Sequence, residues 1–214
     1  MTNRSRILIA DDHNLMAELC QRLLEPEFDV VGVVNDGRTL VRAACELKPD
    51  VVVLDIAMPI LNGLDAGRQL KKMFPVVKLV YLTMNSDVAL AAEAFRRGAS
   101  GYLLKTCAAA DLVRAVRDVL RSRTYLSPAL SRDTMNFLRT KENKLVDESE
   151  LLTNRQREVL QLLAEGRAMK EVAAILRMTT RTVAYHKYRI MEVLGVTTNP
   201  ELVKYAVRTH MVAA

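Results

Sequence analysis

Five polar residues stand where short apolar runs end in the first half of the chain: Asp11, Asp12, Asp55, Thr83 and Lys105. Runs such as "VVVL" before Asp55 are typical of strands covered on both faces, which are apolar without alternation. The carboxyl ends of parallel strands lie at one edge of a sheet, where open sheets bind their ligands. If the sheet is parallel, we expect these side chains to converge, with Asp55 outside the core at the open end of its strand.

Together these residues could hold a phosphoryl group. Three carboxylates at one edge repel each other unless a cation lies among them, and such hard oxygen ligands suit Mg²⁺ or Mn²⁺. Lys105 would supply a fixed positive charge, Thr83 a hydroxyl donor, and one carboxylate an acceptor for the phosphoryl group. A single aspartate after a strand is more often a turn or helix-cap residue, so the indication comes from the set.

The pattern of the first 120 residues predicts the elements that bring these side chains together. Strands are expected at residues 6–10, 28–34, 50–54, 77–82 and 101–104. Helices are expected at residues 14–24, 38–47, 64–73, 87–97 and 108–120. This alternation predicts an α/β fold with a five-stranded, doubly wound parallel sheet covered by helices on both faces.

The chain changes character after residue 122. Residues 123–150 combine Ser, Pro and mixed charges and are interpreted as a linker, in which residues 131–138 could form a helical segment. From Leu151 onward no strand pattern occurs and four helical segments follow. We therefore predict an α/β domain over residues 1–122 and an all-α domain over residues 151–214.

Local signals mark the ends of the four C-terminal helices. Thr153 and Gln156 have the spacing of a capping box at the start of the first helix. Gly195 is a natural stop for the third helix, and Asn199 is the expected cap of the fourth. A short turn at Met178–Thr179 joins the second and third helices, which predicts a helix-turn-helix unit.

Composition and charge narrow the class of protein. Half of the residues are hydrophobic and 26% are charged, as in ordinary globular proteins. Residues 151–214 carry 10 Lys and Arg against 5 Asp and Glu, which points to a polyanion as partner of this part. No apolar run approaches the ~20 residues of a membrane span, and no signal peptide is evident, so we expect a cytoplasmic protein. The three cysteines are far apart and suggest neither a disulfide framework nor a zinc site.

The segments "ILIADDH", "VVVLDIAMPILNGLDA", "YLTM" and "GYLLK" resemble the signature segments of the receiver domain of two-component response regulators. The resemblance spans residues 5–121. It implies that Asp55 is the phosphoacceptor, receiving phosphate from a sensor histidine kinase. It also implies that Asp12, Asp55 and the backbone carbonyl of Ala57 bind Mg²⁺, with Asp11 acting mainly through a bound water.

The same resemblance implies a switch. Lys105 would contact the phosphoryl group, and Thr83 and Tyr102 match the pair that moves on phosphorylation. The new oxyanion at Asp55 would draw Thr83 and Lys105 inward, and Tyr102 would turn into the gap.

Two residues beside this site, Thr106 and Met84, depart from the family pattern, and a third, His13, could be imagined as a metal ligand. Thr106 follows Lys105, where many receivers have a proline in a cis peptide; a cis bond before a non-proline residue costs ~3–4 kcal/mol, so we do not expect one. Met84 stands where many receivers carry a small residue, and we interpret it as restricting access to the acyl phosphate. His13 is expected at a helix start or on the surface, because oxygen-only sites suit Mg²⁺.

The C-terminal segment, with "LTNRQREVLQLLAEG", "KEVAAIL", "TVAYHKYRI" and "LGV", resembles the LuxR/NarL-type DNA-binding domain over residues 151–212. The third helix would lie in the major groove of double-stranded DNA. The resemblance assigns base-edge contacts to Ala184, Tyr185 and Tyr188, although packing or a phosphate hydrogen bond is an equal alternative for the tyrosines. Its remaining candidates for DNA contact are Thr179, Arg181, Thr182, Lys187 and Arg189.

Two further features of this domain follow from the resemblance. His186 matches a common family histidine and is expected to pack or to touch the DNA backbone. The last helix matches the family's dimerisation helix through Leu202, Val203, Ala206 and Val207, although part of it must also serve the core of its own domain. Two copies would bind an inverted-repeat site, as symmetric dimers do.

The favoured interpretation is a DNA-binding transcriptional response regulator that accepts a phosphoryl group and is not a turnover enzyme. A phosphatase or phosphotransferase with an aspartyl-phosphate intermediate also needs Asp, Thr, Lys and Mg²⁺, but its nucleophile typically follows the first strand. A DNA-binding protein regulated by a small ligand without phosphorylation is the third possibility, against which the intact acidic set argues.

Overall fold

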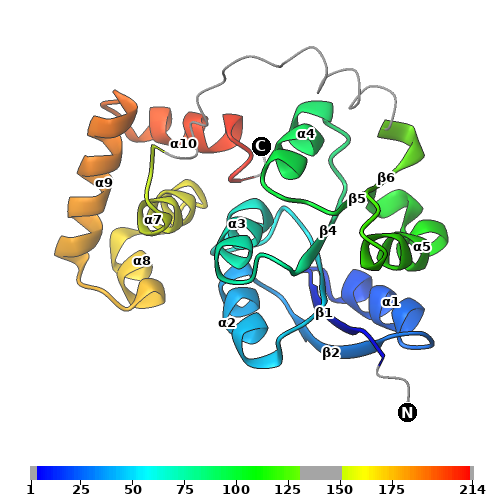
Figure 1. The fold of residues 1–214 in the computed structure, drawn as a ribbon. Coiled ribbons are helices and arrows are strands. Elements are labelled where there is room, and N and C mark those ends of the chain that lie inside the picture. The colour runs from blue at the N-terminus through cyan, green and yellow to red at the C-terminus, as the bar shows by residue number, and fades with distance from the viewer. Residues whose placement is uncertain (1–3, 131–150, 213–214) are drawn as a thin grey trace. The chain divides into compact units, whose positions relative to one another are not determined.

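The computed structural model describes residues 4–130 and 151–212 (Figure 1). The chain divides into two compact units, residues 1–142 and 143–214. The helical segment expected at residues 131–138 lies outside the described residues. Within the described ranges, no helix has both the length and the apolar character that a membrane span requires.

The N-terminal unit is built on one parallel sheet. Its strands are β1 (Arg6–Ala10), β2 (Asp29–Val34), β3 (Val51–Leu54), β4 (Lys78–Thr83), β5 (Gly101–Leu104) and β6 (Tyr125–Leu126). They are ordered β2-β1-β3-β4-β5-β6, and every adjacent pair is parallel. The predicted doubly wound parallel sheet is confirmed, and the carboxyl ends of its strands meet at one edge.

Helices cover both faces of this sheet (Figure 1). They are α1 (Asn14–Leu24), α2 (Gly37–Leu47), α3 (Gly63–Met73), α4 (Val88–Arg96) and α5 (Ala108–Leu120), with a short 3₁₀ turn η1 (Lys105–Cys107). Successive residues of a strand face opposite sides, so Ile7 and Ile9 pack with α1 and α5, while Leu8 and Ala10 pack with α2, α3 and α4. Two apolar layers therefore fix the strands whose ends carry the polar residues.

The sixth strand lies in the segment that we interpreted as linker. Tyr125 pairs with Gly101 in parallel register, and its side chain is only 7% exposed. The buried Ser127 hydroxyl accepts a hydrogen bond from the backbone N–H of Leu104 at 3.0 Å. Two residues are too few to show a strand period, so the sheet continues past residue 122 without a sequence signal.

The C-terminal unit contains α7 (Asn154–Ala164), α8 (Met169–Leu176), α9 (Thr180–Leu194) and α10 (Asn199–Arg208). The capping box of Thr153 and Gln156 is confirmed, and Gly195 ends α9 in the left-handed conformation at φ +66°. The expected cap of α10 is wrong by one residue. Thr198 is the cap, because Glu201 hydrogen-bonds back to its N–H at 2.9 Å and completes a capping box that Asn199 cannot form.

Candidate functional site

The two central aspartates lie just past the ends of adjacent strands. Asp11 follows β1 and donates its backbone N–H to the carbonyl of Val34 at 3.1 Å. Asp55 follows β3 and donates its N–H to the carbonyl of Ala10 at 2.8 Å. Each hydrogen bond extends the sheet ladder by one step, so both carboxyl groups are held by the sheet itself.

The expectation that Asp55 lies outside the core is wrong. Asp55 is 3% exposed and Asp11 is 2% exposed. Partners within reach offset the cost of burying these charges. The Oδ1 atom of Asp55 accepts the N–H of Ile56 at 2.6 Å, and its Oδ2 atom accepts a hydrogen bond from Lys105 at 2.8 Å.

The Lys105 ammonium lies between the two buried carboxylates. Its Nζ atom is 2.8 Å from Asp11 Oδ2 and 2.8 Å from Asp55 Oδ2, and its side chain is 4% exposed. Burial alone would lower the pKa of Lys105, but the attraction of the Asp11 and Asp55 carboxylates outweighs burial and raises that pKa above its ordinary value. Lys105 is therefore a fixed cation of this site.

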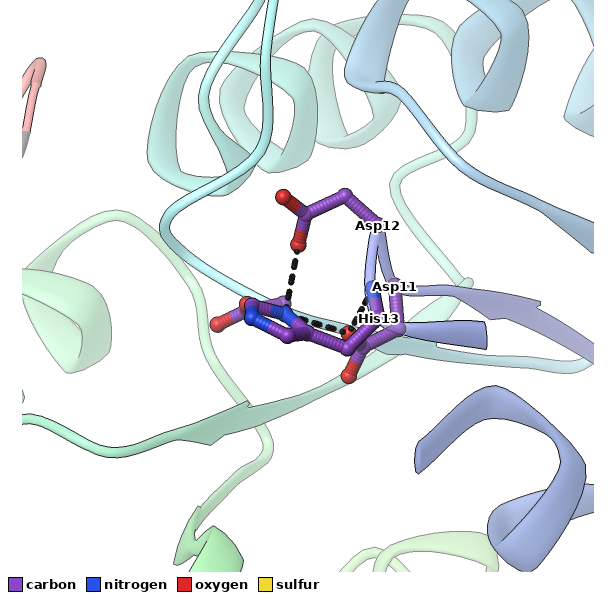
Figure 2. Close-up of side chains that lie close together, drawn as sticks. Asp11, Asp12 and His13 are labelled. Atoms are coloured by element: carbon purple, nitrogen blue, oxygen red, sulfur yellow. Dashed lines mark hydrogen bonds and ion pairs between the residues drawn. The ribbon is translucent and has the colours of Figure 1, made fainter. Parts of the chain in front are cut away.

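Asp12 and His13 lie beside Asp11 (Figure 2). The His13 Nδ1 atom is 2.9 Å from Asp12 Oδ1 and 3.5 Å from Asp11 Oδ1. His13 is the cap residue of α1, as predicted, and its side chain is 70% exposed. Asp11, Asp12, His13 and Asp55 each offer one ligand atom, and these atoms lie within 4.8 Å of one another. The carboxylate oxygens among them match the oxygen ligands that Mg²⁺ and Mn²⁺ take.

Thr83 and Tyr102 both bond to Asn85. Thr83 ends β4 at 3% exposure, and its Oγ1 atom accepts the Asn85 N–H at 3.1 Å. Tyr102, in β5, is fully buried and donates its hydroxyl to the Asn85 carbonyl at 3.1 Å. The two hydroxyls thus bind the backbone N–H and the backbone carbonyl of the same residue, Asn85, in the loop before α4. Met84, between Thr83 and Asn85, is 69% exposed.

The loops around the site are tightly fitted. Gly63, at the start of α3, lies so close to Asp55 that an added Cβ would be 2.0 Å from the Asp55 carbonyl oxygen. Ala57 lies in the same β3–α3 loop and is exposed. No peptide bond in the described ranges is cis, so the Lys105–Thr106 bond is trans, as expected.

In the C-terminal unit, α9 is capped by Thr179, whose Oγ1 atom accepts the Thr182 N–H at 3.1 Å. Val183 and Ile190 are fully buried on its inner face. The outer face exposes Tyr185 at 62% and Tyr188 at 67%.

The candidates for phosphate contact surround that outer face. Arg181 and Arg189 are exposed, and Lys187 is half-buried with its Nζ atom 6.0 Å from the centre of the Tyr188 ring. Burial and then the charge of Arg155 lower the pKa of His186, whose ring packs edge-on against Tyr185. This helix is a candidate nucleic-acid interface.

Two family models match the chain, one for each unit. Residues 7–117 match the response regulator receiver domain, and residues 150–206 match the bacterial regulatory proteins of the luxR family. The chain belongs to the LuxR family of two-component response regulators. Its first unit is therefore a receiver domain and its second a LuxR-type DNA-binding domain.

Known response regulators resemble the chain over nearly its whole length. The transcriptional regulatory protein DegU of Brevibacillus brevis is 32% identical, covering 98% of this chain and 96% of DegU. The oxygen regulatory protein NreC of Staphylococcus aureus is 33% identical, covering 96% of this chain and 98% of NreC. The RcsB response regulator of Salmonella typhimurium has a similar structure, with a TM-score of 0.60, 26% identity, and coverage of 97% of this chain and 100% of RcsB.

The receiver site includes residues that the sequence did not single out. Asn85 partners both Thr83 and Tyr102, yet "TMNSD" reads only as a turn-rich loop. Gly63 contacts the Asp55 backbone, and the glycine of "NG" signals a turn rather than that contact.

The final helix of the regulator, α10, packs into the core of its own domain. Leu202 and Ala206 of α10 are buried, at 3% and 0% exposure. Val203 is 38% exposed and Val207 is half-buried. Of the four residues matched to a dimerisation helix, two are therefore core residues of this domain.

Proposed function

We propose that Asp55 accepts a phosphoryl group from a sensor histidine kinase, and that this modification switches DNA binding by the LuxR-type domain. The observation that carries the proposal is the contact between the Asp55 carboxylate and the Lys105 ammonium. The same ammonium also forms an ion pair with Asp11. A buried carboxylate nucleophile in contact with a fixed cation suits the transfer of a phosphoryl group, which carries several negative charges.

The residues of the site have distinct roles in the transfer. An Asp55 oxygen attacks the phosphorus atom of the kinase's phosphohistidine, and the phosphorus–nitrogen bond breaks with the imidazole as leaving group. Lys105 shifts from the Asp55 carboxylate to a phosphoryl oxygen. A bound Mg²⁺ or Mn²⁺ would be held by Asp11, Asp12, Asp55 and the backbone carbonyl of Ala57. It would neutralise further negative charge of the phosphoryl group. Because Asp55 follows β3, whereas the nucleophile of phosphatases with an aspartyl-phosphate intermediate typically follows the first strand, we propose that the protein accepts phosphate, with slow self-hydrolysis at most, and does not turn over as an enzyme.

The signal then leaves the site through Asn85. When the Thr83 hydroxyl turns to donate to a phosphoryl oxygen, its hold on the Asn85 N–H weakens. The Asn85 carbonyl also accepts the Tyr102 hydroxyl, so the loop before α4 and the Tyr102 side chain adjust together. This changes the surface formed by α4 and β5.

The DNA-binding partner follows from the second unit. Its excess of basic residues and the exposed outer face of α9 favour double-stranded DNA. One solved RcsB structure is described as two dimers bound to two parallel DNAs, and another as an RcsB–DNA complex. We propose by analogy that this chain binds DNA as a homodimer on an inverted repeat. Because DNA and the phosphoryl-donating part of a sensor histidine kinase both lie in the cytoplasm, we propose that the protein is cytoplasmic.

Mass spectrometry after incubation with acetyl phosphate and Mg²⁺ tests the proposal. We expect one adduct of about 80 Da, the mass of a phosphoryl group, on Asp55. Rapid hydrolysis of the donor without a lasting adduct would favour the phosphatase, and a chain that binds DNA with no adduct would favour the ligand-regulated protein. The Asp55→Asn variant is the control. If it were still phosphorylated and switched like the wild type, the role of Asp55 would be wrong.

A further inference from the structure

The outer face of α9 has an unusual composition for a surface that reads DNA. Ala184, Tyr185 and Tyr188 recur at helical spacing opposite the buried Val183 and Ile190, and we call these three residues the reading face. Because α9 is held by two fully buried side chains, the orientation of the reading face is fixed by the core of the domain. Its chemistry therefore decides what the helix can recognise.

The reading face lacks the groups that make paired hydrogen bonds to base edges. Guanine is commonly read by Arg or Lys and adenine by Asn or Gln, each through two hydrogen bonds. An alanine methyl and an aromatic ring instead contact the 5-methyl group of thymine. A tyrosine ring also presents a negative face to the weakly positive C–H bonds of a methyl group.

The neighbouring charged groups are arranged to flank the reading face. Arg189 Nη1 is 2.5 Å from Glu192 Oε2, so its charge is already paired. The Lys187 ammonium lies 6.0 Å from the centre of the Tyr188 ring. Glu192 adds an acidic group toward the C-terminal half of the exposed face, which disfavours close approach of phosphates there. We therefore expect base contacts from the part of α9 that precedes Arg189, which includes Tyr188.

We propose that α9 recognises DNA chiefly through the 5-methyl groups of thymine, contacted by the Ala184 methyl and the rings of Tyr185 and Tyr188. Each half-site then carries thymines where these three side chains enter the major groove. Arg181 and Lys187 contact phosphates and contribute affinity without reading sequence. This inference rests on the proposed DNA-binding function and specifies its ligand.

Uracil substitution tests the inference directly, since uracil pairs as thymine does and lacks only the methyl group. The full chain, treated with Mg²⁺ and acetyl phosphate, is used to select binding sites from duplex DNA of random sequence. Affinity is then measured for the selected site and for copies with single thymines replaced by uracil. We expect a loss of about fourfold for each methyl contact removed, as for the burial of one methyl-sized group. The salt dependence of binding should not change, because the phosphates are untouched.

A pair of variants assigns the contacts. Tyr188→Phe keeps the ring, so it should retain the thymine-over-uracil preference at every position. Tyr188→Ala should lose that preference at one thymine and keep it at the others, which a double-mutant cycle would show as coupling. Since Tyr188 is 67% exposed, neither change disturbs the core.

Two outcomes would overturn the inference in different ways. If sequence-specific binding persists and every uracil copy binds as well as the thymine site, thymine methyls are not read, and the proposed DNA-binding function stands. If no sequence is enriched from the random library, the DNA-binding function fails and the inference fails with it.

Discussion

Replacing Lys105 by methionine removes the charge from the receiver site while keeping most of the side-chain volume. In the wild type, Lys105 Nζ is 2.8 Å from a carboxylate oxygen on each of two aspartates that are 2% and 3% exposed. Removing one partner of a buried ion pair typically costs ~3–5 kcal/mol. Water can reach the edge at Asp12, whose side chain is 31% exposed, so we expect about 3 kcal/mol for Lys105→Met.

The chain contains no tryptophan, so urea unfolding is best followed by circular dichroism. Hydrogen exchange of the β3 amides adds a readout that belongs to the receiver domain alone. The matched control is Lys78→Met, because the one hydrogen bond of the Lys78 ammonium to the described residues is an exposed one to the Ser122 hydroxyl, at 3.3 Å. We expect that control to change the free energy of unfolding by less than about 0.5 kcal/mol.

Mg²⁺ should narrow the difference between wild type and Lys105→Met. A divalent cation can replace the missing positive charge and should bind more tightly to the more negative site of Lys105→Met than to that of the wild type. Binding at 100 times its Kd stabilises a folded protein by about 2.7 kcal/mol. If Lys105→Met cost less than about 1 kcal/mol without divalent cations, the argument that Lys105 stabilises two buried carboxylates would be refuted.

The raised pKa of Lys105 also sets a pH dependence. The folded pKa lies above the ordinary 10.5, so folding favours the protonated ammonium. The contribution of this group to stability is full below pH 10.5 and is lost as the pH rises through the folded pKa. Unfolding measured at alkaline pH should show this loss in the wild type and lack it in Lys105→Met.

Four further variants test separate parts of the regulator. Tyr102→Phe removes the hydrogen bond to Asn85, so it should cost about 0.5–1.5 kcal/mol in urea unfolding and weaken the change in DNA affinity on phosphorylation while leaving the Asp55 adduct intact. Met84→Ala should shorten the half-life of the adduct in mass spectrometry, because a smaller side chain gives water better access; an unchanged half-life would contradict this role. Gly63→Ala places a Cβ 2.0 Å from the Asp55 carbonyl oxygen, so it should destabilise the receiver by roughly 1–3 kcal/mol and reduce phosphorylation by acetyl phosphate. Arg181→Ala should weaken DNA binding similarly for all sequences and reduce the salt slope by about one, whereas a sequence-dependent loss would show base contact by Arg181.

Much of the receiver could be predicted because its signals are local and strong. The runs at residues 6–10 and 101–104 became β1 and β5 with the expected bounds, since apolar runs of strand length between breakers leave few alternatives. The convergence of Asp11, Asp55 and Lys105 also followed from one topological rule about parallel sheets.

Other features depended on distances that no pattern encodes. β6 is two residues long, and its pairing relies on a register set by Gly101 and Tyr125. The burial of Asp55 was misjudged because the sequence placed Lys105 at the same edge of the sheet but did not give the 2.8 Å contact that offsets the cost of a buried carboxylate. The cap of α10 was misplaced by one residue because Thr198 and Asn199 are both good caps, and the choice depends on where Glu201 reaches.

The proposed phosphorylation of Asp55 has a physical route to the surface formed by α4 and β5. Lys105 contacts two carboxylates, so its ammonium can leave Asp55 for a phosphoryl oxygen while Asp11 still compensates its charge. Thr83 and Tyr102 both hydrogen-bond to Asn85, so a change in one of these hydrogen bonds affects the other. Lys105 exchanges one partner for another and is not left buried without one, which limits the free-energy difference between the two arrangements. A ligand that discriminates between the arrangements can then shift their populations, and linkage makes the proposed effect of phosphorylation on DNA binding reciprocal.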